Sequence, residues 1–374
     1  MKNKIRDWLT VGMFALVILG FAVTNLFYDA GEISTTERRR LAVFPTFSAA
    51  AVKDGSFMTG IEDYLTDHFV GRDSFRRLKA GFMFNILGQK DNHKIYVVDG
   101  SASEYSAVLP EASLEQITEK FGILRDKYLE GCNLYYSVIP DKNYFLAEAG
   151  GYPAYDYDAF LSIMRDRMEG FTEIDLFGTL DIDDFYRTDL HWDQSRLTEA
   201  TAALCAGLGI TPPDLASMTA HTLSPFWGVY YGQSALSLEP DTLTYLTSPV
   251  LDGCSFSVLN ERTMQFEEKP LYNEAQFSGI DPYSTFLEGP IPLAKITNPA
   301  ATTERRLLLF RDSFGSAIAP LLAAGGEYAE IWVIDLRYIY AKLLPEFIDI
   351  RPGDDVLLLY NTQILANSTL FQIN

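Results

Sequence analysis

Hydrophobic positions along the chain change their spacing several times, and the first uninterrupted run is the longest. Residues 8–27 contain no charged side chain, which makes a run of 20 residues. A helix needs about 20 apolar residues to cross the hydrocarbon core of a bilayer. Lys2, Lys4 and Arg6 precede the run, and positive charge on that side predicts a cytoplasmic N-terminus. The pattern therefore predicts a transmembrane helix within residues 1–28.

The residues after this run decide between an anchor and a cleaved signal. A cleaved signal peptide has a shorter apolar core and ends in a small-x-small cleavage site. Residues 25–30 read Asn-Leu-Phe-Tyr-Asp-Ala, which does not fit such a site. We expect an uncleaved signal anchor in preference to a cleaved signal or a buried core helix. Residues 29–374 would then lie outside the cytoplasm, held at the cell membrane by a single pass.

Residues 29–93 predict an extracytoplasmic stalk and a helical arm. Polar residues interrupted by Gly and Pro occupy residues 31–56 and favour a stalk. Apolar residues then recur at helical spacing through residues 57–88. Gly71 falls within this stretch and predicts that it is divided into two helices.

Residues 94–374 alternate short apolar runs with amphipathic stretches, which is typical of an α/β domain with a mostly parallel sheet. The expected strands are at 94–98, 132–139, 307–310, 330–335 and 356–360, and the expected helices at 114–129, 158–168, 197–208 and 314–324. Ser113 is expected to be the N-cap of the first of these helices. Residues 211–300 are rich in Pro, Thr, Ser and Tyr, and predict a β-rich insertion of hairpins or long loops.

Net charge narrows the classes of partner. The 374 residues include 50 Asp and Glu against 30 Lys and Arg, for a net charge of −20. This balance argues against nucleic acid, whose binding depends on cationic contacts to phosphate. It also argues against docking of the whole chain on an anionic lipid surface.

The three cysteines, Cys132, Cys205 and Cys254, match no zinc-binding spacing. Each lies among apolar neighbours, so we expect buried thiols. One disulfide remains an alternative outside the cytoplasm.

Asp189 and His191 form the first segment that suggests chemistry. A carboxylate two residues before a histidine can accept the ring N–H, which fixes the tautomer and stabilises the imidazolium. The same spacing also suits an ordinary polar turn before the helix at 197–208, and spacing alone leaves both interpretations open.

Ser313 lies in the second such segment, Arg311–Gly315, between an apolar strand and a helix. Open α/β folds place their sites at the carboxyl ends of sheet strands. Free N–H groups at a helix start can also stabilise a developing oxyanion. The alternative is that Asp312 or Ser313 only caps the helix.

Together with other short motifs, these segments resemble the DHHW proteins of Gram-positive bacteria, which are relatives of the SGNH-like proteins that O-acetylate alginate. The matching residues are Glu37–Pro45, Tyr64, Asp67–Phe69, Arg72, Asp73, Val138–Lys142, Asp189–Trp192, Phe226–Gly228, Pro240–Leu243, Arg311–Gly315 and Ile334–Tyr338. Each motif alone is common, whereas their order and spacing are specific. The resemblance implies an SGNH-like three-layer α/β domain over residues 94–374.

The resemblance also implies roles for three residues. In the acetylating relatives an Asp-x-His pair precedes the nucleophilic serine, so Asp189 would orient His191, and His191 would be the general base for Ser313. A degenerate triad is the alternative. Leu190 stands where the name of the family has its first histidine, and this departure makes a metal site less expected. No metal and no cofactor are predicted.

Further residues near the expected strand ends are candidates for binding substrate or an oxyanion. They are Asn361, Arg311, Trp192, Arg337 and Tyr338. Packing or structural ion pairs would explain each of these residues as well.

The function implied by the resemblance is O-acetylation of a polysaccharide outside the cytoplasm. Ser313 would carry the acetyl group, and a membrane-bound O-acyltransferase would be the partner that supplies it. Two alternatives stay open. One is a carbohydrate acetylesterase with the same triad, and the other is a non-catalytic glycan-binding scaffold of an envelope assembly.

Overall fold

The computed structural model describes residues 2–373, and the chain divides into two compact units. The first unit comprises the residues up to Asn92 together with Gly232–Ser237. The second unit comprises His93–Tyr231 and the residues from Leu238 onward.

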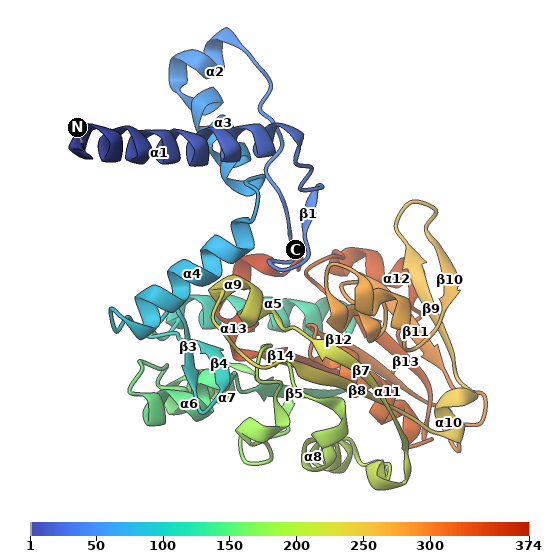
Figure 1. The fold of residues 1–374 in the computed structure, drawn as a ribbon. Coiled ribbons are helices and arrows are strands. Elements are labelled where there is room, and N and C mark those ends of the chain that lie inside the picture. Colours follow the sequence, from blue (N-terminus) through green and yellow to red (C-terminus); the bar gives the residue numbers. More distant parts are fainter. Residues whose placement is uncertain (1, 374) are drawn as a thin grey trace. The chain divides into compact units, whose positions relative to one another are not determined.

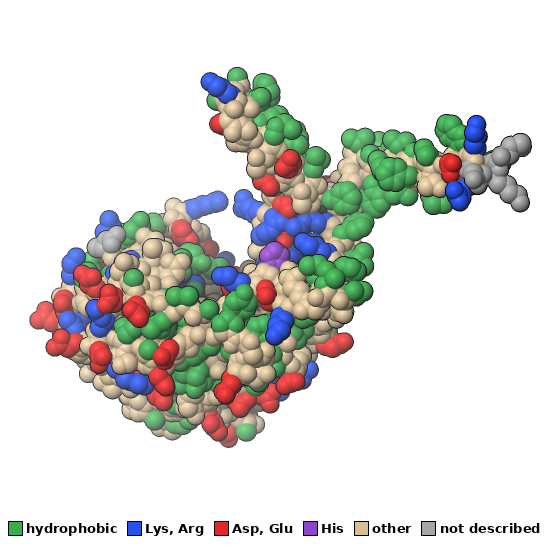
Figure 2. All heavy atoms as spheres, turned by 90° about the vertical axis from the view of Figure 1, so that its left-hand side faces the viewer, with side chains coloured by type: hydrophobic (Ala, Val, Ile, Leu, Met, Phe, Trp, Pro, Cys, Tyr) green, Lys and Arg blue, Asp and Glu red, His purple; other side chains and the backbone are tan. Residues whose placement is uncertain are grey.

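The first unit begins with α1 (Lys2–Phe27), an exposed apolar helix. Its span Lys4–Phe27 is long and apolar enough to cross a membrane. In Figure 2 hydrophobic side chains gather along this helix. The predicted apolar helix is therefore present, and length and composition alone fit both an anchor and a signal sequence.

A helical arm follows α1. It contains the short strands β1 (Ile33–Ser34) and β2 (Arg39–Arg40), and the helices α2 (Ala49–Asp54), α3 (Ser56–Asp67) and α4 (Arg72–Asn85). Gly71 separates α3 from α4 with a φ of +73°, a conformation that glycine adopts without strain. The prediction of two helices divided at Gly71 is confirmed.

Ion pairs join the segments of the arm. Both oxygens of Asp67 accept hydrogen bonds from Arg39, at 2.6 and 2.7 Å, and one also accepts from the Ala42 N–H. These bonds lower the pKa of Asp67 to about 2. Glu37 pairs with Arg72 and with Arg76, and so connects the strand region to α4.

The second unit is built on an eight-stranded sheet of order β10-β9-β11-β13-β12-β14-β5-β6 (Figure 1). Its strands are β5 (Asn133–Ile139), β6 (Thr172–Glu173), β9 (Ser255–Asn260), β10 (Gln265–Lys269), β11 (Leu293–Thr297), β12 (Arg305–Arg311), β13 (Tyr328–Ile334) and β14 (Asp355–Asn361). The strands β13, β12, β14, β5 and β6 pair in parallel, and β11, β9 and β10 extend one edge by antiparallel pairing. The predicted mostly parallel sheet is confirmed.

Both faces of the sheet are covered, which makes three layers. Along β12, Leu307 and Leu309 belong to one hydrophobic core, and Leu308 and Phe310 belong to the other. The first core includes α8 (Thr198–Leu208) and α11 (Gly315–Ala324). The second core includes α5 (Glu111–Tyr128) and α7 (Tyr157–Arg167). Because successive side chains of a strand point to opposite faces, a doubly covered strand is apolar throughout, as Leu307–Phe310 is.

Smaller elements complete the unit. They are β3 (Ile95–Val98), β4 (Ser101–Glu104), α6 (Lys142–Gly150), β7 (Thr219–Phe226), β8 (Asp241–Thr247), α10 (Pro249–Asp252), α12 (Leu344–Phe347) and α13 (Thr362–Leu365), while α9 (Val229–Ser234) crosses into the residues of the first unit. Within residues 211–300, β7 and β8 form a separate antiparallel pair, whereas β9, β10 and β11 belong to the main sheet.

The predicted cap at Ser113 is wrong. The helix α5 begins earlier, at Glu111, with Pro110 at the N-cap position. Ser113 therefore lies inside the first turn, where its hydroxyl donates to Leu365 O and accepts from Ser368 N–H. These contacts are made by residues about 250 positions away in the chain, which no local pattern could reveal.

Candidate active site

Asp189, His191 and Ser313 form one continuous hydrogen-bonded chain. His191 Nδ1 lies 2.6 Å from Asp189 Oδ1, and His191 Nε2 lies 2.7 Å from Ser313 Oγ. Asp189 and His191 are buried, and Ser313 is partly exposed. When Nδ1 donates its proton to the carboxylate, Nε2 is left to accept the proton of the serine hydroxyl. The arrangement can therefore raise the nucleophilicity of Ser313.

The strand β12 and the helix α11 position Ser313 between them. The buried carboxylate of Asp312 accepts the Phe314 N–H at 3.0 Å and the Asn361 N–H, at the end of β14, at 2.7 Å. These two bonds fasten the serine turn to the neighbouring strand, and burial raises the pKa of the Asp312 carboxyl. Asp312 thus orders the turn instead of capping α11, whose N-cap residue is Phe314.

Two backbone donors and the imidazole hold the Asp189 carboxylate. Oδ1 accepts the His191 N–H at 3.0 Å in addition to Nδ1, and Oδ2 accepts the Val229 N–H at 2.8 Å. The neighbouring residue Gly228 makes this approach possible, because a Cβ there would overlap the carbonyl group of Thr188. Gly228 N–H also donates to the Thr188 hydroxyl at 2.9 Å.

Lys142 holds the same turn from inside the protein. Its ammonium donates to the backbone carbonyls of Tyr186, Arg187 and Asp189 at 2.6, 3.1 and 3.0 Å. The side chain is buried, and burial lowers the pKa of Lys142 to about 7. Lys142 belongs to the Val138–Lys142 motif of the sequence, but the motif alone does not show what the lysine contacts.

Tyr283 is a site residue that sequence reasoning missed. Its ring stacks on the His191 imidazole with centroids 3.8 Å apart and planes 6° apart. The tyrosine is buried, and its hydroxyl has no hydrogen-bond partner among residues 2–373. No local pattern distinguishes Tyr283 from the other tyrosines of the 211–300 region.

Asn361, a candidate oxyanion donor, already uses its side-chain amide in hydrogen bonds within the protein. Its amide donates to the carbonyls of Ile139 and Pro140 at 3.2 and 3.3 Å, and its Oδ1 caps α13 by accepting Gln363 N–H. The residue is buried, so Asn361 joins the ends of β14 and β5 and does not present its amide to a substrate.

The backbone around Ser313 offers one available donor. Phe314 N–H donates to Asp312 Oδ1, and Gly315 N–H donates to Asp312 O at 3.1 Å. Within the described part of the chain, the Ser313 N–H has no acceptor.

Two other candidates are buried and structural. Trp192 is fully buried and its indole N–H donates to Phe314 O at 3.0 Å, so it ties the histidine turn to the serine turn and has no face for a sugar ring. Arg311 is also fully buried, where it pairs with Asp335 at 3.5 Å and donates to Gly289 O at 3.2 Å. Neither side chain is accessible to a substrate.

The last two of the five candidates, Arg337 and Tyr338, follow β13 in the chain. Arg337 makes two hydrogen bonds to Asp335, at 2.9 and 2.7 Å, and its guanidinium lies 5.4 Å from the centroid of the Tyr338 ring. Tyr338 is about half exposed, so of the five candidates it is the one with a large free surface.

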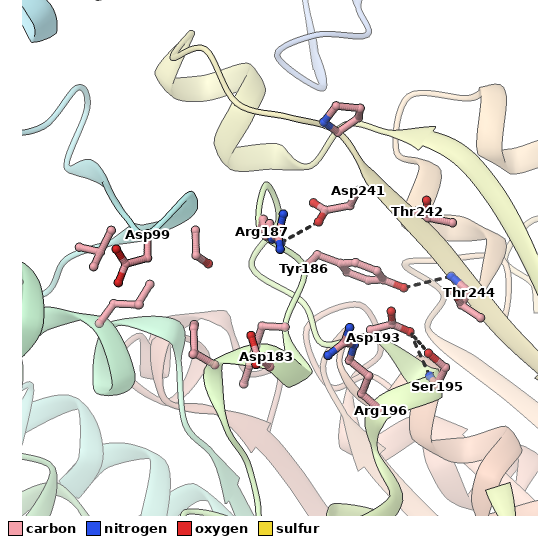
Figure 3. Close-up of a pocket in the computed structure, with 16 residues that line it drawn as sticks. Asp99, Asp183, Tyr186, Arg187, Asp193, Ser195, Arg196, Asp241, Thr242 and Thr244 are labelled. Carbon is pink, nitrogen blue, oxygen red and sulfur yellow. Dashed lines mark hydrogen bonds between the residues drawn. The ribbon is translucent and has the colours of Figure 1, made fainter. Parts of the chain in front are cut away.

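A separate cavity of about 520 Å³ is lined in part by Tyr186, Arg187 and Asp193, which lie before and after the Asp189–Trp192 turn in the chain (Figure 3). Its charged lining residues are Asp99, Asp183, Arg187, Asp193, Arg196 and Asp241, and Ser313 is not among the residues that line it. Asp241 accepts the N–H groups of Arg187 and Thr188 at 2.9 and 2.8 Å, so one wall of the cavity supports the turn that carries Asp189.

Two further observations concern metals and thiols. Within residues 2–373 there is no group of three or more His, Cys, Asp or Glu side chains that could hold a metal ion. Cys132, Cys205 and Cys254 are free thiols, and burial raises the pKa of each.

Comparison with known proteins adds three findings. A family model described as DHHW protein matches residues 180–334. A solved DHHW family protein from Eubacterium siraeum covers 74% of this chain and 92% of its own, with 22% identity and a TM-score of 0.58. Bacillus cereus PatB1, solved with a sulfonyl adduct, covers 75% of this chain and 98% of its own, with 18% identity and a TM-score of 0.57.

A more distant likeness involves the O-acetyltransferase domain of Pseudomonas putida AlgJ, at 14% identity and a TM-score of 0.42, over 73% of this chain and 92% of that one. No curated protein sequence matches the chain. The predicted resemblance is confirmed: the DHHW family model matches residues 180–334, and the chain shares its α/β fold with the solved DHHW protein and PatB1.

Proposed function

We propose that the chain is an O-acetyltransferase that acts outside the cytoplasm. It would move an acetyl group through Ser313 to a hydroxyl of a cell-envelope or secreted polysaccharide. The observation that carries this proposal is the chain of contacts from Asp189 through His191 to Ser313, with heavy-atom distances of 2.6 and 2.7 Å. These distances are within the range required for proton transfer between a nucleophile and its base.

The first half-reaction forms the acyl-enzyme. Ser313 Oγ attacks the carbonyl carbon of the acetyl donor while His191 Nε2 takes the hydroxyl proton. The carboxylate of Asp189 stabilises the resulting imidazolium, and the Ser313 N–H donates to the oxyanion. The bond to the leaving group then breaks, His191 returns the proton to that group, and acetyl-Ser313 remains.

The second half-reaction transfers the acetyl group. A polysaccharide hydroxyl loses its proton to His191 and attacks the acetyl carbon. The bond between that carbon and Ser313 Oγ breaks, His191 returns the proton to Ser313 Oγ, and the O-acetylated glycan is released. Water in place of the glycan would give acetate, and the same residues would then act as an esterase. Exclusion of water from the acyl-enzyme separates the two outcomes.

The N-terminal helix supports the proposed place of action. We propose that α1 is retained as an anchor, because residues 8–27 of this helix carry no charge and the basic residues Lys2, Lys4 and Arg6 precede them on the side expected to be cytoplasmic. Anchoring would keep the enzyme near the membrane-bound O-acyltransferase that the resemblance implies as acetyl donor.

Product analysis tests the proposal. The full chain in detergent is incubated with an activated acetyl ester and an acceptor oligosaccharide, and both acetylated glycan and acetate are quantified. Ser313→Ala is compared with Ser316→Ala, a matched control, because the Ser316 hydroxyl is buried and has no partner among the described residues.

Acetylated glycan formed by the wild type and by Ser316→Ala, but not by Ser313→Ala, is the expected result. Acetate as the only product that depends on Ser313 would establish the esterase instead. Equal ester turnover by all three proteins would reject both the acetyltransferase and the esterase activity, and would favour a non-catalytic glycan-binding scaffold.

A further inference from the structure

We propose that the helical arm, residues 29–92, lies in the membrane interface beside α1, with an exposed apolar face of α4 among the lipids. The arm would then orient the enzyme at the bilayer surface instead of serving as a passive spacer. This inference rests on α1 being retained in the membrane, and it is independent of the reaction proposed for Ser313.

The arm exposes more large hydrophobic side chains than the second unit does, although it is much shorter. Within residues 29–92, twelve large hydrophobic side chains are exposed: Ile33, Val43, Phe44, Phe47, Val52, Met58, Leu65, Phe75, Leu78, Phe82, Ile86 and Leu87. Within residues 93–374, a stretch four times as long, only seven are exposed among the residues described. Apolar surface at such density marks a region that contacts a lipid surface or another macromolecule.

One face of α4 carries a regular stripe of this surface. Phe75, Leu78 and Phe82 in α4 and Ile86 at its C-cap follow one another at intervals of three or four residues, which places them on the same side of the helix. Their exposed fractions are 48%, 69%, 49% and 69%. A helix with a continuous apolar face and charged residues elsewhere is the form that lies in a membrane interface.

The stripe is continuous with the apolar surface of α1 through ring contacts of Phe21. This continuity favours lipid over a protein as the partner that covers the stripe. The ring of Phe21 in α1 lies 5.5 Å from the ring of Phe69 and 5.9 Å from that of Phe75, centroid to centroid. The Val70 N–H donates to Asn25 Oδ1 at 2.8 Å, which joins the connection between α3 and α4 to the end of α1. A lipid layer around the outer end of α1 would therefore also surround the start of α4.

The charge of the arm also favours a lipid surface as its partner. Residues 29–92 contain nine Lys and Arg residues and nine Asp and Glu residues. Residues 93–374 contain 18 Lys and Arg residues and 40 Asp and Glu residues. The helix α4 itself carries four cations, Arg72, Arg76, Arg77 and Lys79, against the single anion Asp73. Anionic headgroups would repel the second unit but not the arm, so the argument from net charge against lipid docking applies to the second unit alone.

Depth-dependent fluorescence quenching tests this inference on the full chain. After the three native cysteines are replaced, a bimane probe is attached to Leu78→Cys, and the protein is reconstituted in vesicles of phosphatidylcholine and phosphatidylglycerol with brominated acyl chains. Arg77→Cys is the matched control, because Arg77 is an exposed neighbour outside the stripe. Val17→Cys, in the middle of α1, reports whether α1 is inserted.

We expect the probe at position 78 to be quenched about twofold or more relative to position 77, since the apolar face of an interfacial helix lies below the headgroups. Quenching at position 17 with equal, weak quenching at 78 and 77 would overturn the inference and leave the face for a protein partner. No quenching at position 17 would overturn it as well, because the arm would then have no membrane beside it. Circular dichroism of each variant verifies that the fold is retained.

Discussion

At the scale of single residues, Tyr283 shows how a side chain without chemistry of its own can support His191. Its ring stacks on the imidazole, but its buried hydroxyl has no partner within residues 2–373. We expect Tyr283→Phe to keep the activity and to raise the free energy of unfolding by about 1 kcal/mol, because a buried, unsatisfied hydroxyl is removed. Tyr283→Ala should lower both the activity and the free energy of unfolding, because it leaves a cavity against the imidazole.

Denaturant unfolding and ester turnover of the two variants test this prediction. A loss of activity in Tyr283→Phe with normal stability would show that the hydroxyl has a role that stacking does not explain.

Lys142 leads to a prediction about pH. In the folded protein burial lowers its pKa to about 7, whereas the ordinary value of a lysine is 10.5. Between these pH values the unfolded chain holds a proton that the folded chain has released, so the free energy of unfolding should rise with pH. In Lys142→Met this contribution is absent. The stability of the wild type relative to Lys142→Met should therefore increase from pH 7 to pH 10, as measured by urea unfolding in matched buffers. Parallel curves for the two proteins would contradict the prediction.

The residues of the triad were predictable from the sequence, while the residues that support them were not. Asp189 and His191 are two positions apart, and Ser313 follows an apolar strand, so local patterns marked them as candidates, and the resemblance to the DHHW proteins implied their roles. Tyr283 and Val229 reach the site through long-range contacts that no spacing encodes. The same limit explains Asn361, which is the last residue of β14 and uses its amide to join the ends of β14 and β5.

At the scale of elements, the approach of the segment after β7 to the Asp189 turn depends on Gly228. An added Cβ would overlap the Thr188 carbonyl, which is backbone and cannot move aside by changing a rotamer. We expect Gly228→Ala to displace the Val229 N–H from Asp189 and to lower turnover about tenfold or more, which corresponds to about 1.4 kcal/mol in the barrier.

The matched control for this variant is Gly122→Ala, because Gly122 lies in the helix α5 and a Cβ there would meet nothing within 4 Å. Initial rates of ester cleavage compare the two proteins. Equal rates for Gly228→Ala and the wild type would show that this contact does not matter for the chemistry.

The elements themselves were predicted well where both faces of a strand are buried. Leu307–Phe310 is continuously apolar and is the central part of β12, because each face of the sheet is covered by helices. In residues 211–300 the strands alternate less clearly, and sequence alone did not show that β9, β10 and β11 extend the main sheet. Strand pairing there depends on partners far along the chain, such as β13 for β11.

At the scale of the whole molecule, charge and apolar surface are divided between the two units. The excess of acidic residues lies in 93–374, while most of the exposed large hydrophobic side chains lie in α1 and the arm. Such a division is consistent with the proposed function, in which the second unit stays in solution and the N-terminal part is held at a membrane. The apolar helix was evident from the sequence, but the exposed stripe of α4 was not, because helical spacing does not tell a core face from an exposed one.

Intact-mass spectrometry tests most directly whether Ser313 is an activated nucleophile. The full chain in detergent is incubated briefly with an activated acetyl ester and quenched in acid. The proposed mechanism predicts a mass gain of one acetyl group on the wild type and on Ser316→Ala, with the modified peptide containing Ser313, and no gain on Ser313→Ala. If the wild type gained no acetyl group and cleaved the ester no faster than Ser313→Ala, Ser313 would not be an activated nucleophile and the proposed mechanism would be wrong.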